Sequence, residues 1–506
     1  MNNFYITTPI YYVNDIPHIG HAYTTIACDI LSRFHKLCGA KVYFLTGTDE
    51  HGQKVEKAAI DASIDTNIFV SQMSDNFKKL IPFLGCEIDD FIRTTEPRHK
   101  QSSQQFWLKL KNNNQIYLSN YEGWYSVRDE AYYSDKELIK KNNEFFAPTG
   151  SPVEWVKEES YFFKLSEWGD KLLAYYTKNP DSILPKTRYN EVVSFIKSGL
   201  KDLSISRTTF KWGVEVPDNS KHVMYVWIDA LCNYLTAIKY PDKSNKLFKD
   251  FWPATHIVGK DILRFHAVYW PAFLMAADIE PPKKIFAHGW WTNEGQKISK
   301  SLGNTIDPYD IINTYGLDQI RYFLFREVPF GNDGDFSKNA IANRVNADLS
   351  NNYGNLVQRI STFAKKNCDS QVKNTTNFNK EDNILIDLLK NSFQNYLNFL
   401  NDQKIDQSLK VIMNLLSETN AYIDSQAPWN LKKTNIERMN TVLFLSLNII
   451  VKASIMLLPI IPNSANKVLD ILNISLKNRN FHNIEQLIDA NLNINNPVPI
   501  FPRIEK

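Results

Sequence analysis

Two histidines separated by Ile-Gly stand near the start of the chain, in the stretch HIGH at residues 18–21. The pair could ligate a metal, form a nucleophile with its base, bind a phosphate, or only pack. A metal needs a third ligand, and covalent catalysis needs a serine or cysteine beside the histidine; neither stands out here. The preceding TTPIYY is typical of a strand, and Pro17 suits a first helical turn, which puts His18 and His21 near a helix N-terminus. Such a terminus favours phosphate through its N–H groups and dipole, and Gly20 lets a flat ring or a phosphate approach the backbone.

A second stretch with chemical potential is KISKS at residues 297–301, which follows the strand-like KIFAHGWWT. It sets the ammonium groups of Lys297 and Lys300 on a short loop, with Gly295 and Gly303 as flexible flanks. By itself the loop indicates only a basic surface. Two mobile ammonium groups also suit a triphosphate, because they neutralise the charge that builds up during displacement. The helix start and the lysine loop together predict phosphate chemistry.

The remaining sequence supplies the elements that must position these residues. Strand-like and helical patterns alternate over residues 1–115 and again over 216–336, which predicts one Rossmann-like catalytic domain built on a parallel sheet. Residues 116–215 are short, aromatic, strand-like pieces with turn residues, which predicts a small and mostly β insertion. Residues 337–506 carry helical spacing throughout and predict an all-α helical bundle.

Composition excludes several classes of protein. A chain of 506 residues with 22% charged and 43% hydrophobic residues is typical of a soluble protein of two or three domains. Its net charge of +3 does not indicate a general nucleic-acid binder, although it permits a local basic surface. The five cysteines include no CxxC pair, which argues against a disulfide scaffold and against a cysteine zinc knuckle. The N-terminus shows no signal for secretion. The apolar stretch 441–462 is interrupted by Asn448, Lys452 and Pro459, so we interpret it as a buried core helix and expect a cytoplasmic protein without membrane contact.

HIGH followed by KISKS resembles the class I aminoacyl-tRNA synthetases. The fuller resemblance, over essentially the whole chain, is to the methionyl-tRNA synthetases. KISKS carries Ile298 where that family usually has methionine, a change of similar volume that keeps both lysines. The similar segments, in the family's order, are TTPIYYVNDIPHIGHAYTT, FLTGTDEHGQK, FIRTTEPRHK, YVWIDALCNYL, HIVGKDILRFHAVYWPAFL, FAHGWWTNEGQKISKSLGN and REVPFGNDGDFS.

The resemblance implies that ATP, accompanied by Mg²⁺, activates L-methionine, and that the methionyl group then passes to tRNA(Met), including the initiator. The carboxylate of methionine would attack the α-phosphate directly, so positioning and charge stabilisation would do the work. The implied roles are phosphate contacts for His18 and His21, adenine binding over Gly20, ribose binding at Gly259 and Asp261, and stabilisation of ATP and the departing pyrophosphate by Lys297 and Lys300.

A methionine pocket is also implied by the resemblance. Asp49 would bind the α-ammonium group, and aromatic walls suit the polarisable thioether. The implied methionine-binding residues are Ile10, Tyr12, Asp49, Trp227, Ala230, Tyr234 and His288.

The C-terminal helices would bind tRNA. Asn355 and Arg359 stand at i and i+4 and share one helix face, and Trp429 follows Pro428. Unpaired bases are read by aromatic stacking and by hydrogen bonds to their edges. In the similar family these three positions read the CAU anticodon.

The insertion departs from many relatives, which fold it around zinc with cysteines at CxxC spacing. Ser126 and Asp129 stand where the first pair of cysteines would lie, and this segment offers neither soft nor imidazole ligands. We therefore expect no structural zinc and a metal-free knuckle held by its aromatic residues Trp124, Tyr125, Tyr132 and Tyr133. The dimerisation module that some relatives append after the helical bundle is not seen, so we expect a monomer.

Three alternatives stay open at this point. Synthetases for leucine, isoleucine or valine usually carry a large editing insertion, and residues 116–215 are too short for it; a cysteinyl enzyme would need zinc-binding cysteines. A smaller nucleotidyltransferase of the superfamily would not need the helices of residues 337–506. A non-catalytic RNA-binding paralogue would not need to keep HIGH and both loop lysines.

Overall fold

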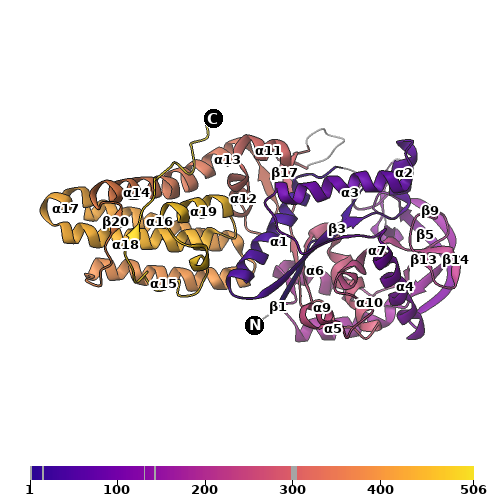
Figure 1. Ribbon diagram of the computed structural model, residues 1–506. Coiled ribbons are helices and arrows are strands. Elements are labelled where there is room, and N and C mark those ends of the chain that lie inside the picture. The colour runs from indigo at the N-terminus through magenta and orange to yellow at the C-terminus, as the bar shows by residue number, and fades with distance from the viewer. Residues whose placement is uncertain are drawn as a thin grey trace. The chain divides into compact units, whose positions relative to one another are not determined.

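The computed structural model describes residues 3–13, 16–129, 131–141, 144–293, 295–297 and 305–505. The chain forms two compact units, many of whose elements are labelled in Figure 1. We call Asn3–Pro17 with Val42–His288 the sheet unit, and His18–Lys41 with Gly289–Lys506 the helical unit. This division groups the helix that begins within HIGH with the C-terminal helices, whereas the boundaries drawn from the sequence at 115, 215 and 336 stay a prediction.

The sheet unit contains the predicted parallel sheet. Strand β1 pairs with β15, β15 with β16, β16 with β10, and β3 with both β2 and β4, all in parallel. A parallel sheet needs crossover connections and cover on its faces, and helices supply both. The strands are β1 Asn3–Thr7, β2 Tyr11–Tyr12, β3 Lys41–Asp49, β4 Asp90–Arg93, β10 Ile183–Leu184, β15 Thr255–Gly259 and β16 Lys284–His288. The helices are α2 Gln53–Asp61, α3 Thr66–Phe83, α4 Pro97–Asn112, α5 Gly169–Lys178, α6 Lys186–Lys197, α7 Val226–Leu231, α8 Asn233–Thr236, α9 Lys246–Phe251 and α10 Trp270–Ala276.

The predicted insertion begins as expected with antiparallel strands. In the larger of its sheets β5 pairs with both β6 and β9, and β9 pairs with β11. However, α5 and α6 also fall within 116–215, and β10 of this range joins the parallel sheet. The other strands of this range are β5 Ile116–Ser126, β6 Ala131–Tyr133, β7 Ile139–Lys141, β8 Glu144–Phe146, β9 Glu154–Phe163, β11 Leu203–Ser204 and β12 Ser206–Arg207; β13 Glu215–Val216 and β14 Asn219–Met224 follow at its C-terminal boundary.

The helical unit is dominated by long amphipathic helices, as the spacing after residue 337 predicts. A small sheet in which β17 pairs with β18 and β19 precedes most of them, and β20 pairs with β21 near the end of the chain. The strands are β17 Trp291–Asn293, β18 Gln296–Lys297, β19 Gly334–Phe336, β20 Gln371–Val372 and β21 Leu492–Asn493. The helices are α1 Ile19–Leu37, α11 Pro308–Tyr315, α12 Leu317–Arg326, α13 Lys338–Arg344, the π-helical η6 Val345–Gly354, α14 Asn355–Asn367, α15 Lys380–Asn401, α16 Ile405–Gln426, α17 Pro428–Thr434, α18 Ile436–Leu457 and α19 Pro462–Ile471.

A buried ion pair anchors α1 inside the helical unit. Arg321 of α12 donates to the carboxylate of Asp29 on α1 at 2.6 Å, and both side chains are buried. The same guanidinium donates to the carbonyls of Pro459 and Ile460, between α18 and α19. Separating the two partners would leave an uncompensated buried charge, which is costly. The pair therefore favours the position in which α1 lies against α12.

Among the described residues, α18 is the one helix long and apolar enough to cross a membrane, but 94% of its apolar window is buried inside the protein. Its polar residues are paired: the Asn448 side chain accepts from the backbone N–H of Ile488, and Lys452 Nζ donates to the carbonyl of Asn483 at 3.2 Å. Burial lowers the pKa of Lys452 to about 8. The interpretation of this stretch as a core helix is confirmed.

Candidate functional site

The HIGH residues form the N-terminal cap of α1. His18 is the N-cap, so Pro17 lies before the helix; the expectation that Pro17 occupies the first turn was wrong, because the His18 side chain caps the helix. Its Nδ1 accepts from the Gly20 N–H, and His21 Nδ1 accepts from the His18 N–H, both at 3.1 Å. A neutral ring that accepts at Nδ1 carries its proton on Nε2, the atom that can then donate to a phosphate oxygen.

The lowered pKa of His21 agrees with a neutral ring that donates from Nε2. Desolvation, and secondarily the neighbouring His18 with ring centroids 3.9 Å apart, lower the pKa of His21 well below its usual value. The ring is therefore neutral near pH 7. A side chain at Gly20 would bring its Cβ within 2.9 Å of the His18 ring, so glycine is required for this cap geometry.

The lysine loop continues from a hairpin in the helical unit. Strand β18 ends at Lys297, whose backbone pairs with Thr292 of β17, and the Gly295 N–H donates to Asp335 at 2.7 Å. Gly295 has a φ of +77°, which a residue with a side chain adopts only at a cost. Lys300 and Gly303 lie outside the described residues.

The predicted methionine-binding residues all lie in the sheet unit, and four of them belong to or pack against its main hydrophobic core cluster. Trp227 of α7 stacks on Phe265 with ring centroids 3.7 Å apart and an interplanar angle of 5°. Ile10, Tyr12 and Trp227 are partly buried against the same core cluster that contains Tyr234, and Ala230 is buried on α7.

A histidine that the sequence reasoning did not single out, His266, contacts this group. Its Nδ1 donates to the carbonyl of Ile262 at 3.0 Å, which leaves Nε2 to accept from the Tyr234 hydroxyl at 2.7 Å. Burial lowers the pKa of His266 to about 4, so the ring stays neutral near pH 7. The Tyr234 hydroxyl is therefore the donor and His266 Nε2 the acceptor in the hydrogen bond between them. Its position in the segment HIVGKDILRFHAVYW was the available signal.

The predicted ribose-binding residues and His288 meet at the ends of β15 and β16. Gly259 pairs with His288 across the two strands. A Cβ at Gly259 would lie 2.5 Å from an Asp261 carboxylate oxygen and 3.9 Å from the His288 ring. His288 therefore lies beside the VGKD backbone, whereas His266 contacts Tyr234.

Asp49 ends β3 and is 7% exposed. Its backbone carbonyl accepts from the N–H of Val13, which follows Tyr12, at 3.2 Å. The next residue, Glu50, is buried and receives a two-pronged hydrogen bond from Arg93 at 2.6 and 3.0 Å. These contacts fix the strand end that presents Asp49.

A buried triad not foreseen from the sequence connects this strand end to α7. One carboxylate oxygen of Asp229 accepts from His51 Nδ1 and the other from His99 Nε2, each at 2.7 Å. Burial alone would raise the pKa of Asp229, but the two histidines hold it well below its usual range. Asp229 lies between Trp227 and Ala230 in sequence, and His51 shortly follows Asp49, so the triad joins two groups of predicted pocket residues.

The Asp129 carboxylate lies at the centre of a cluster of hydroxyl groups in the described part of the knuckle. Asp129 accepts from the hydroxyls of Thr149, Ser151 and Tyr133, and its own N–H donates to Ser126 Oγ at 3.2 Å. Burial would raise the pKa of Asp129, but these hydroxyls lower it below its usual value. The predicted aromatic packing is present at Trp124, whose ring contacts the rings of Phe145 and Trp155. The hydroxyl cluster around Asp129 was missed.

The predicted anticodon residues lie on the C-terminal helices. Asn355 begins α14 and is exposed; Arg359 on the same helix donates to Asp424 at 3.0 Å and to Asn420 at 3.2 Å, both on α16. Trp429, on the following helix α17, is 41% exposed. That exposure argues against a core-filling role and suits a stacking surface.

Comparisons with known proteins agree along the whole chain. A family described as "tRNA synthetases class I (M)" matches residues 4–142 and 142–361, and one described as "Anticodon binding domain of methionyl tRNA ligase" matches residues 372–505. The methionine--tRNA ligase of Rickettsia felis is 56% identical over 511 residues, covering 100% of this chain and 99% of the relative. That of Brucella suis is 48% identical over 503 residues, covering 99% and 98%.

Solved structures give the same answer. Mycobacterium tuberculosis methionyl-tRNA synthetase in complex with methionyl-adenylate superposes with a TM-score of 0.97 at 45% identity, covering 99% of this chain and 100% of that one. Its apo form gives a TM-score of 0.91 at 42% identity, covering 100% and 99%. With both family descriptions matched in order and relatives similar from end to end, the chain belongs to the methionyl-tRNA synthetases of class I.

Proposed function

We propose that the residues described above carry out the two-step charging of tRNA(Met). The chain activates L-methionine with ATP to methionyl-adenylate and pyrophosphate, and then transfers the methionyl group from the adenylate to the 3′-terminal adenosine of tRNA(Met), the initiator included, with release of AMP. The observation that carries this assignment is the match of both family descriptions, one over HIGH and the pocket residues and the other over the C-terminal helices.

In the first step a carboxylate oxygen of methionine attacks the α-phosphorus of ATP, and the bond to pyrophosphate breaks. His18 and His21 donate from Nε2 to phosphate oxygens, a role supported by the protons that their Nδ1 contacts assign. Lys297 and Lys300 stabilise the charge that accumulates on the departing pyrophosphate. Mg²⁺ would accompany ATP and would neutralise part of the charge of its phosphates.

For the substrates, Asp49 binds the α-ammonium group of methionine. Trp227, Tyr234, Ile10, Tyr12, Ala230 and His288 complete the pocket, and we add His266, because it fixes the direction of the Tyr234 hydroxyl. Gly20 lies under the adenine, and Gly259 and Asp261 bind the ribose. Asn355, Arg359 and Trp429 read the anticodon, supported by the exposure of Asn355 and Trp429.

The wider proposal keeps the domain boundaries 1–115, 116–215, 216–336 and 337–506. It places the enzyme in the cytoplasm as a monomer, without membrane contact and without structural zinc.

The test of the activity is ATP–pyrophosphate exchange across a panel of amino acids. We expect exchange with methionine and only weak exchange with leucine, isoleucine, valine or cysteine. Preferred exchange with another amino acid would assign a different synthetase, and no exchange with any would favour an RNA-binding protein without catalysis.

The knuckle gives a metal prediction. Elemental analysis of the purified protein should show no stoichiometric zinc, and chelators should leave methionine-dependent exchange intact, because the Asp129 carboxylate already joins the knuckle through hydroxyl groups. One zinc per chain, lost together with activity on chelation, would overturn this part of the proposal.

The Asp229 triad gives a third prediction. Asp229→Asn leaves one of two histidine N–H groups facing an amide NH₂, a loss of about 1–3 kcal/mol of folding free energy. We expect a lower melting temperature and a KM for methionine that rises more than the KM for ATP. Asp181→Asn, at an exposed position of the same unit, should change neither. Equal rises in both KM values would show that the triad does not act on the methionine pocket.

A further inference from the structure

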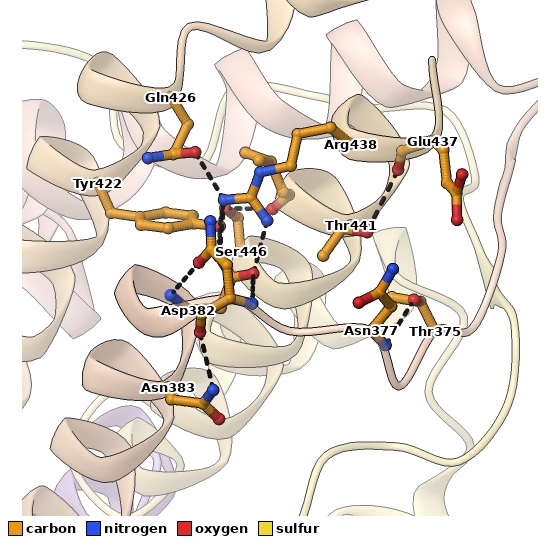
Figure 2. Close-up of polar contacts among 12 residues, drawn as sticks. Thr375, Asn377, Asp382, Asn383, Tyr422, Gln426, Glu437, Arg438, Thr441 and Ser446 are labelled. Atoms are coloured by element: carbon orange, nitrogen blue, oxygen red, sulfur yellow. Dashed lines mark hydrogen bonds and ion pairs between the residues drawn. The ribbon is translucent and has the colours of Figure 1, made fainter. Parts of the chain in front are cut away.

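Arg438 of α18 lies at the centre of a polar cluster in the helical unit, shown in Figure 2. Its guanidinium donates to both carboxylate oxygens of Asp382 at 2.5 and 2.9 Å. It also donates to the side-chain carbonyl of Gln426 at 2.6 Å and to the Tyr422 hydroxyl at 3.4 Å. We call these four residues the Arg438 cluster.

Asp382 makes the cluster rigid. It is buried near the start of α15, where it exchanges hydrogen bonds with Asn379 in a capping box at 2.9 and 3.0 Å. Burial would raise the pKa of Asp382, but the hydrogen bonds from Arg438 and Tyr422 lower it, so the carboxylate is charged near pH 7. A two-pronged arginine–carboxylate pair of this kind fixes geometry, while its net effect on stability is small once desolvation is counted.

The cluster lies where the chain enters and leaves α17, the helix that carries Trp429. Gln426 is the last residue of α16, and Ala427 then turns the chain into α17 with φ 45° and ψ 64°. At the other end Asn435 follows α17 and caps α18 by accepting from the Arg438 backbone N–H at 3.0 Å. Arg438, in the first turn of α18, thus donates a hydrogen bond to Gln426, the last residue of α16, on the other side of α17 in the sequence.

Apart from its packing against α18, α17 has few buried side chains to fix its orientation. It has seven residues, all described, and Pro428 is the one that is buried. A helix this short is not stable by itself, so its direction depends on how its ends are held. A side chain of α17 that stacks on a base binds it more tightly when the helix is already oriented, because ordering the helix on binding would lower the affinity.

We infer that Arg438 is a positioning residue for tRNA binding: by joining Gln426 to Asp382 it holds α17 in the orientation that presents Trp429 to an unpaired base. This inference rests on the proposed function of Trp429. Arg438 itself does not have to touch RNA.

The test uses Gln426→Ala, which removes the hydrogen bond from Arg438 to the end of α16, just before α17, and leaves the Arg438–Asp382 pair in place. In the full-length protein we expect tRNA(Met) binding to weaken about 5–10-fold, on the scale of one ordinary hydrogen bond. Arg438→Lys, which keeps the charge and loses the planar fork, should weaken it similarly. Methionine-dependent exchange, which uses no tRNA, should be unchanged in both.

A double-mutant cycle with Trp429→Ala separates positioning from general loosening. If Arg438 acts through Trp429, Gln426→Ala adds little to the loss already caused by Trp429→Ala; full additivity overturns the inference. The matched control is Arg479→Gln, which breaks the ion pair with Asp470 on α19 of the same unit and should leave tRNA binding unchanged. An equal loss in this control would also overturn the inference.

The two proposals fail in different ways. If Trp429→Ala leaves tRNA binding unchanged, the anticodon role of Trp429 fails, and the inference fails with it. If Trp429→Ala weakens binding while Gln426→Ala and Arg438→Lys do not, the inference alone fails.

Discussion

Replacing Lys300 with alanine is expected to lower kcat of methionine-dependent exchange by roughly 10²–10³-fold, the usual cost of removing one group that stabilises transition-state charge. The KM for methionine should change far less, because the ammonium group interacts mainly with pyrophosphate as it departs. Initial rates over a range of methionine and ATP concentrations separate the two parameters.

A matched control is Lys338→Ala, which removes an exposed lysine from the start of α13 in the same unit. It should leave kcat unchanged, because a positive charge outside the lysine loop does not stabilise the departing pyrophosphate. If Lys300→Ala raised the KM for methionine as much as it lowered kcat, the loop would have a structural role instead.

Replacing Trp429 with alanine is expected to weaken tRNA(Met) binding by roughly 1–3 kcal/mol, the typical value of one base–aromatic stack. Methionine-dependent exchange should be nearly unchanged, because that reaction does not involve tRNA. Aminoacylation should fall through a higher KM for tRNA, and also through kcat if anticodon binding helps to seat the acceptor end. Binding, exchange, charging and the melting curve should be measured on one preparation.

Leu476→Ala provides the control, because this side chain is also apolar and exposed, at 79%, in the helical unit. It should leave tRNA binding intact. A lower melting temperature with parallel damage to exchange and charging in Trp429→Ala would show that the tryptophan supports the fold rather than the RNA.

Local sequence determined the parts of this protein that depend on neighbouring residues. HIGH predicts a helix start with two histidines at its N-terminus, and His18 and His21 do make that cap. The 3.6-residue spacing of the C-terminal region predicts its helices, and the apolar stretch around Lys452 predicts a buried one. These features follow from backbone hydrogen bonding and amphipathic periodicity within a few turns of chain.

Only the tertiary structure decided which distant side chains meet. Asp229 accepts from His51 and His99, which lie 178 and 130 residues away in sequence, and no local pattern announces such a triad. Arg438 reaches Asp382 across 56 residues for the same reason. A buried carboxylate must find donors wherever the chain path brings them, so its partners are set by the packing of elements rather than by spacing in the sequence. The motifs therefore predict which residues form the proposed site, and the fold decides which other side chains surround them.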